Sequence, residues 1–330
     1  MVRFELLTEK DLGRTSVLNI SKAQGKIVAG TYHGELLIGN KSIDAHSGQL
    51  LALYVDGDKI LTGGSDGYIR LRSLEGSKLG ELEISNDYVY GITKIDSSYA
   101  ICDGSGKLYF VSPDLNSYKE IDAYEEKRPA REIISIPERR LILVGYYDGL
   151  IRVFDYRGKK VRDIYRTTGD SVTLMRLYEP LGMIITGFWS GRISLLYYKG
   201  YTIEMKSGRS KKKIQIEPWK PIDLQTIGSV ARWAYIHDEH LLALGGNGKL
   251  SFQKLDRLLR AALSTRGTRI VARRTETLHD YGANGGFLEE NILYSAGLDG
   301  YIKERKIINE RFLLFDEICL RLISFYKTPL

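Results

Sequence analysis

Two sets of polar residues repeat one spacing, in which a hydroxyl residue follows a histidine by sixteen positions and an aspartate follows it by twenty. The sets are His46, Thr62 and Asp66, and His279, Ser295 and Asp299. A histidine beside a carboxylate and a hydroxyl can activate the hydroxyl for nucleophilic attack, so these residue types permit catalysis. Finding the same trio in two distant parts of one chain favours a structural role instead. We therefore assign no catalytic residue.

The remaining residues offer little to a metal or a cofactor. The other histidines are His33, His237 and His240, and the last two flank Asp238 and Glu239 in a segment that reads as a polar hairpin turn. Cys102 and Cys319 are too few and too far apart to form a disulfide framework or a metal knuckle, and we expect buried free thiols. We predict no metal, no cofactor and no enzymatic activity.

One pattern recurs seven times along the 330 residues: a short apolar β-prone run, a turn that ends in glycine, and a second run that alternates apolar and polar residues. The seven segments are KIVAGTYHGELLIG, KILTGGSDGYIRLR, YAICDGSGKLYFV, LILVGYYDGLIRVF, MIITGFWSGRISLL, LLALGGNGKLSFQ and ILYSAGLDGYIKER. Their turn glycines are Gly34, Gly67, Gly106, Gly149, Gly191, Gly248 and Gly300. Glycine suits these turns because it adopts a positive φ without a Cβ clash.

Further β-like segments lie between these repeats, which gives about four strands per unit of roughly 40 residues, the layout of a propeller blade. The sequence predicts an all-β fold: one seven-bladed β-propeller domain over residues 1–330, with four-stranded antiparallel blades. We expect pairing of the chain termini to close the ring, because closure removes exposed sheet edges. Residues 2–7 and 311–318 are both candidates for the closing outer strand.

Residues 45–74, AHSGQLLALYVDGDKILTGGSDGYIRLRSL, resemble a blade of the WD-repeat family. In that family a His, a Ser or Thr, an Asp and a Trp form a hydrogen-bonded structural network. By resemblance these places fall on His46, Thr62, Asp66 and Arg72, and in the last repeat on His279, Ser295, Asp299 and Arg305. Arginine thus stands at the Trp place, and in other repeats the turn Asp is replaced by His33, Ser105, Ser190 or Asn247. The resemblance implies a non-catalytic binding scaffold.

The net charge of +7 is concentrated in two segments that fall in the longest intervals between repeats. Residues 199–220 contain seven Lys or Arg against two Glu, and residues 254–274 contain seven against one Asp. The first reads as a hairpin that joins two blades, and the second as a short helix, from Leu255 to Leu263, followed by a basic strand inside the sixth blade. Clustered cations attract phosphate, so we name an anionic-partner candidate set: Lys206, Arg209, Lys211, Lys212, Lys213, Arg266, Arg269, Arg273 and Arg274. Solvated loop tips are the simpler interpretation.

A second candidate surface lies at the turns of the fourth and fifth repeats. Tyr146 and Tyr147, and Phe188 and Trp189, stand at matching places just before the turn Asp or Ser. If these turns share one rim of the propeller, the aromatic side chains could form a protein-binding patch. Packing between blades is the alternative.

The leading hypothesis is a WD-like scaffold for protein–protein interactions, acting as a subunit of a larger complex. Binding of a nucleic acid or ribonucleoprotein through the basic segments is the alternative, and an enzyme with a site near the propeller channel is a third possibility. The first residues, MVRFELLTEK, lack the layout of a secretory signal, and no apolar run is long enough to span a bilayer. We expect an intracellular, cytoplasmic protein, with a nuclear location as the alternative for a eukaryotic source, and no engagement of membranes.

Overall fold

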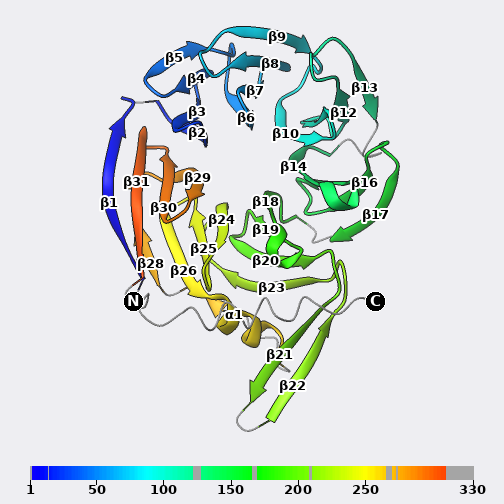
Figure 1. The fold of residues 1–330 in the computed structure, drawn as a ribbon, viewed down its shortest axis with the longest axis vertical. Helices are drawn as coiled ribbons and strands as arrows, with labels where there is room; N and C mark the ends of the chain where they lie inside the picture. The colour runs from blue at the N-terminus through cyan, green and yellow to red at the C-terminus, as the bar shows by residue number, and fades with distance from the viewer. Residues whose placement is uncertain are drawn as a thin grey trace.

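The computed structural model describes residues 2–13, 15–121, 128–165, 169–207, 210–264, 270–272 and 274–309. They form seven blades arranged around one axis, each with four antiparallel strands, and a separate two-stranded hairpin, which confirms the predicted seven-bladed β-propeller (Figure 1). The fifth blade carries one additional short strand.

The strands of each blade are named here from the inner to the outer position. The first blade contains β2 (Val17–Ala23), β3 (Lys26–Thr31), β4 (Glu35–Ile38) and β5 (Lys41–Asp44), and the second contains β6 (Leu50–Asp56), β7 (Lys59–Gly64), β8 (Tyr68–Ser73) and β9 (Lys78–Glu83). The third blade contains β10 (Val89–Ile95), β11 (Ser98–Asp103), β12 (Leu108–Val111) and β13 (Tyr118–Ile121), and the fourth contains β14 (Ala130–Ile136), β15 (Leu141–Tyr146), β16 (Ile151–Asp155) and β17 (Lys160–Tyr165). The fifth blade contains β18 (Val172–Tyr178), β19 (Met183–Phe188), β20 (Arg192–Tyr197) and β23 (Pro221–Thr226). The sixth contains β24 (Ala231–His237), β25 (His240–Gly245), β26 (Lys249–Lys254) and β28 (Thr275–Thr277), and the seventh contains β29 (Ala283–Glu289), β30 (Ile292–Gly297), β31 (Tyr301–Asn309) and β1 (Val2–Asp11).

The hydrophobic core lies between the blades. Alternation puts one side of each strand into such an interface, as in β8, where Ile69 and Leu71 are buried. Each of seven apolar clusters joins two neighbouring blades; one of them packs Val28 and Leu36 of the first blade against Leu50 and Ile60 of the second. A blade therefore buries its faces only with neighbours on both sides.

The N-terminal strand closes the ring. β1 pairs antiparallel with β31, from Val2 opposite Asn309 to Asp11 opposite Tyr301, and lies outermost in the seventh blade (Figure 1). The ring of Phe4 contacts that of Phe252 in the sixth blade, with centroids 5.3 Å apart. Of the two predicted closing segments, residues 2–7 supply the strand; residues 311–318 lie outside the described part of the chain.

Connections alternate between the two faces of the propeller, because consecutive strands in a blade are antiparallel. One face, here called the turn face, carries the turns between second and third strands, including all seven turn glycines, and the segments that enter each blade. The other, the insertion face, carries the turns between first and second strands and those between third and fourth strands.

Both basic segments are insertions between a third and a fourth strand. The first forms the hairpin β21 (Tyr201–Ser207) and β22 (Ser210–Ile216) inside the fifth blade, so the prediction that it joins two blades was wrong. The second contains α1 (Leu255–Ala262) inside the sixth blade, and then β27 (Ile270–Val271), which pairs in parallel with β23 of the fifth blade. The hairpin extends outward from the ring beside α1 (Figure 1). Both insertions therefore leave from the same face.

A belt of hydrogen bonds follows the turn face. Within the described residues, five of the seven turn glycines accept backbone N–H groups at their carbonyls from the segment that enters the next blade: Gly34 from Ala45 and His46, Gly67 from Ile84 and Ser85, Gly191 from Ile227, Gly248 from Leu278 and His279, and Gly300 from Leu12. At Gly67 a φ of +77° combines with a close approach, since an added Cβ would lie 1.9 Å from the Ser85 carbonyl oxygen. Glycine is required there for two independent reasons.

Comparing Gly67→Ala with Gly57→Ala separates these reasons. Gly57 also has a positive φ, of +64°, but nothing lies within 4 Å of an added Cβ. We expect Gly57→Ala to lower the free energy of unfolding by about 1 kcal/mol, the cost of left-handed backbone, and Gly67→Ala by at least about 3 kcal/mol because the belt must also move. Chemical denaturation measures both. Equal losses would show that the glycines serve only local turn geometry.

Candidate interaction surface

The histidine trios are hydrogen-bonded as the resemblance implies. His46 Nδ1 lies 2.9 Å from Asp66 Oδ1, and its Nε2 lies 2.9 Å from Thr62 Oγ1. His279 makes the matching contacts with Asp299 at 3.0 Å and Ser295 at 2.9 Å. Burial lowers the pKa of both imidazoles, which favours their neutral form at pH 7. The Nη1 of Arg70 also lies 2.7 Å from His46 Nδ1. Both histidine side chains are fully buried, away from any substrate.

Arginine at the Trp place bonds to backbone instead of joining the trio. Arg72 Nη1 donates to the Gly76 carbonyl at 3.2 Å, and Arg305 Nη2 donates to the Leu278 carbonyl at 3.4 Å. In the seventh blade this contact ties the third strand to the residue just before His279.

In two other blades, different residues form the hydrogen bond that connects the entering segment to the region of the turn. In the third blade Ser85, at the His place, donates to Asp103, which also accepts from Tyr109 at 2.8 Å. In the fifth blade Asp170 of the entering segment accepts from Ser190 of the turn at 2.8 Å. Sequence reasoning missed Asp103 and Asp170, although each lies near a turn or segment where the expected Asp or His is absent.

The aromatic rim contains only half of the predicted residues. Tyr147 and Trp189 are exposed on the turn face, with 54% and 55% of their surface accessible. Tyr146 and Phe188 are fully buried in clusters between blades, so their assignment to a binding rim was wrong. Each is the last residue of a second strand and still follows the alternation that directs it into the blade interface.

The turn face has further exposed apolar side chains that the sequence analysis did not identify. They are Tyr32 and Leu298 in turns, and Tyr88 and Tyr281 in entering segments. The other exposed large apolar residues in the described part of the chain lie on outer strands: Leu6, Leu7, Leu79, Tyr118 and Val161. Within the described ranges, the most exposed aromatic side chains in connections between strands therefore lie on the turn face.

A β-bulge recurs near the start of all seven inner strands, close to the turn face. The bulged residues, which have no register partner, are Leu18, Leu51, Tyr90, Arg131, Thr173, Arg232 and Asn284. Bulges redirect side chains, and all seven are half-buried around the propeller axis. Asn284 and Thr173 bond to backbone carbonyls of the next blade, at Val17 and Ala231.

Two bulged arginines contact aromatic residues of the turn face. The Cζ of Arg131 lies 5.0 Å from the ring centroid of Tyr90 and 5.8 Å from that of Tyr147. The Cζ of Arg232 lies 5.9 Å from the Trp189 ring. These are cation–π distances, so the exposed aromatic patch is continuous with positive charge near the axis.

Glu132 follows Arg131 in β14. Desolvation raises the pKa of its carboxyl to about 7, although Arg176, Arg131 and Arg232 oppose this shift. At neutral pH the carboxyl is thus only partly ionised and compensates the surrounding guanidinium charge incompletely.

The predicted basic residues are distributed over the insertions, and several cannot be placed. Lys206 pairs with Lys211 in the hairpin, and Lys212 and Lys213 follow opposite Met205 and Glu204. Lys213 and Arg274 are exposed. Arg209, Arg266, Arg269 and Arg273 lie outside the described residues. The hairpin base and α1 are anchored to the blades by Ile216, Leu258 and Leu259, which are buried in one cluster.

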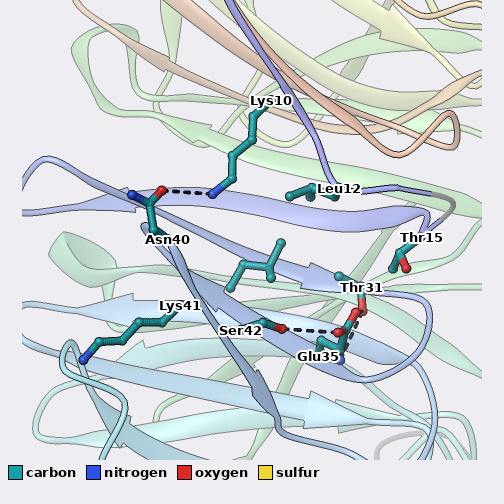
Figure 2. A pocket seen from close by; sticks show the side chains of 9 residues that line it. Lys10, Leu12, Thr15, Thr31, Glu35, Asn40, Lys41 and Ser42 are labelled. Carbon is teal, nitrogen blue, oxygen red and sulfur yellow. Dashed lines mark hydrogen bonds between the residues drawn. The ribbon is translucent and has the colours of Figure 1, made fainter.

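A cavity of about 230 Å³ marks the seam where the ring closes (Figure 2). Residues of the closing segment, including Lys10 and Leu12, face β4 and β5 of the first blade. The polar groups bond to one another: Lys10 donates to the Gly39 carbonyl at 2.6 Å, and Ser42 donates to Glu35 at 3.2 Å. The Lys10 bond crosses the seam and stabilises the closure, whereas the Ser42 bond lies within the first blade.

Within the described ranges, no three His, Cys, Asp or Glu residues come together as a metal site, and no helix is long and apolar enough to cross a membrane. Cys102 is buried as predicted, while Cys319 lies beyond the described residues.

Comparisons with known proteins identify the fold and no family. No protein-family model and no curated protein matches the chain. A crystal structure of the computationally designed protein Ika8 is similar, with a TM-score of 0.66 and 13% identity, covering 92% of this chain and 99% of that one. At this identity the likeness shows the fold alone.

Asp66→Asn tests the structural role of the trio. Burial opposes ionisation of Asp66, but hydrogen bonds from His46 and Arg70 prevail and lower its pKa to about 2. A lowered carboxyl pKa stabilises the fold above the ordinary pKa near 4, and this contribution disappears as the pH falls towards 2. We expect the variant to lose about 2 kcal/mol of unfolding free energy at pH 7, with the difference shrinking below pH 4.

Asp58→Asn is the matched control, because Asp58 is exposed in a turn of the same blade. Urea unfolding at pH 7 and pH 3.5 provides the measurement. Equal stability of Asp66→Asn and Asp58→Asn at pH 7 would contradict the structural assignment.

Proposed function

We propose that this protein is a non-catalytic WD-like scaffold that binds partner proteins through the turn face, as a subunit of a larger complex. The observation that carries the proposal is the placement of exposed aromatic residues: Tyr32, Tyr88, Tyr147, Trp189 and Tyr281 all lie on this face. Water-exposed aromatics are typical anchors of protein interfaces, since they bury much apolar area at little entropic cost.

The structural roles of the histidine trios also support a scaffold. They hold turns to entering segments in two blades, as expected for WD-like repeats, and their polar atoms are already satisfied. The rigid belt beneath the aromatic residues suits a surface that binds without reorganising.

The double variant Tyr147→Ala/Trp189→Ala tests this proposal. Both side chains are more than half exposed, so the fold should tolerate the change, while a partner would lose two anchors. We expect at least a tenfold loss of partner capture from a lysate of the source organism. Capture by the wild type should persist at about 0.5 M salt, because apolar contacts are not screened.

Leu79→Ala/Tyr118→Ala is the control, since both residues are similarly exposed but lie on outer strands. Undiminished capture by Tyr147→Ala/Trp189→Ala, or equal losses in both double variants, would argue against the turn face.

Binding of a nucleic acid through the insertions is a second candidate function. It is favoured by one observation: both basic insertions leave from third-to-fourth-strand connections of neighbouring blades, and β27 of the second pairs with β23 beside the first. Their charges thus belong to one face, where a phosphate backbone could contact both.

For this candidate we expect the affinity for a single-stranded oligonucleotide to fall linearly with salt on a double-logarithmic plot. Lys213→Ala should reduce the slope by about 0.7, the value for one lost phosphate contact on a single strand. Lys249→Ala is the control, because Lys249 is exposed beside a turn of the opposite face. A slope near zero for the wild type would exclude this function.

A further inference from the structure

Two guanidinium groups lie near the centre of the turn face. Burial lowers the pKa of Arg232, and Arg131 is close enough that its charge lowers that pKa further. Arg131 and Arg232 stand at equivalent bulges of the fourth and sixth inner strands, and Tyr90, Tyr147 and Trp189 contact their guanidinium groups. Both carboxylates and cations stand in or beside the surrounding turns and entering segments: Asp87, Asp148 and Asp280, and Lys107, Arg128 and Lys249. The carboxylates of Asp66, Asp170 and Asp299 are bonded to Arg70, Arg192 and His279.

The central guanidinium groups have unused hydrogen-bonding capacity. The Nε of Arg232 is buried without a hydrogen-bond partner, and neither Arg131 nor Arg232 forms an ion pair with a carboxylate in the part of the chain that the structure describes. Both side chains are half-buried as a whole, so their accessible N–H groups can pair with an incoming carboxylate. Glu132 is close but does not neutralise the group fully, because desolvation keeps its carboxyl partly protonated at pH 7.

Resting on the function proposed above, we propose that the partner inserts one or two acidic side chains between Arg131 and Arg232, within a peptide segment whose apolar residues lie on Tyr147 and Trp189. A planar guanidinium suits a carboxylate because the two can form paired hydrogen bonds, and the aromatic contacts hold the guanidinium groups in place. The site offers two half-buried guanidinium groups, so it suits one or two carboxylates better than a long polyanion such as a nucleic acid, whose phosphates need a continuous row of cations.

The test is a selection of 12-residue peptides from a random display library on the full-length protein, followed by fluorescence anisotropy with fluorescein-labelled selected peptides at about 0.15 M salt. We expect selected peptides to be enriched in Asp or Glu next to apolar residues. Replacing the acidic residue by its amide should weaken binding to the wild type at least tenfold, and binding to Arg131→Gln/Arg232→Gln less than twofold.

Two further variants sharpen the comparison. Arg157→Gln is the matched charge control, because Arg157 is an exposed arginine on the insertion face; its binding should equal that of the wild type. Glu132→Gln removes the carboxylate that competes for the guanidinium groups, so it should bind the same peptides several-fold more tightly at pH 8.

The inference is overturned if selected peptides lack acidic residues, or if acidic peptides bind Arg131→Gln/Arg232→Gln as well as they bind the wild type. Tighter binding of a thymidine 20-mer that depends on the same two arginines would also overturn it. If Tyr147→Ala/Trp189→Ala loses the natural partner while Arg131→Gln/Arg232→Gln retains it, the scaffold function stands and the acidic-segment inference fails. If both retain the partner, the scaffold function itself fails.

Discussion

The hydrogen-bonded belt on the turn face is the interaction on which the rest of the structure depends. A turn glycine accepts N–H groups from the segment that enters the next blade, and in several blades that segment bonds through side chains to the next turn, as His46 does to Asp66. At five of the seven junctions in the described part of the chain, those after Gly34, Gly67, Gly191, Gly248 and Gly300, neighbouring blades are thereby joined by backbone as well as by a shared apolar cluster. The N-terminal segment completes the belt where Leu12 donates to Gly300. Adjacent turns consequently keep fixed positions relative to one another.

The turn face and the insertion face of the propeller differ in chemistry. The turn face presents aromatic side chains on short, fixed turns, with Arg131 and Arg232 at bulges near its centre. The insertion face carries two basic additions whose roots are packed into the fifth and sixth blades by Ile216 and Leu258. Consecutive connections of a propeller lie on opposite faces, so residues close in sequence can belong to different surfaces. The protein-binding surface proposed for the turn face and the nucleic-acid surface considered for the insertion face therefore do not overlap.

Local sequence patterns predicted most of the fold, because the turn glycines and the strand alternation are local requirements. The trio around His46, the hairpin at residues 199–220 and the helix from Leu255 were predicted for the same reason. The site was predicted less well. Tyr146 continues the alternation of Ile142 and Val144 into the blade interface, but the sequence did not show that the strand extends as far as Tyr146 and ends before Tyr147. The bulge at Arg131 interrupts the two-residue period, so alternation gives no indication that this side chain lies near the axis. The carboxylate of the third blade stands at Asp103, two positions before the expected turn residue.

Site-specific photo-crosslinking tests the central claim most directly, that partners bind the turn face. A photoreactive phenylalanine analogue would replace Tyr147 or Tyr281 on the turn face, and Arg157 on the insertion face or Tyr118 on an outer strand, in separate samples of the full-length protein incubated with a lysate of the source organism. The account predicts cross-links to a common partner from positions 147 and 281 and none from 157 or 118. Cross-links from 157 or 118, with positions 147 and 281 silent, would contradict it.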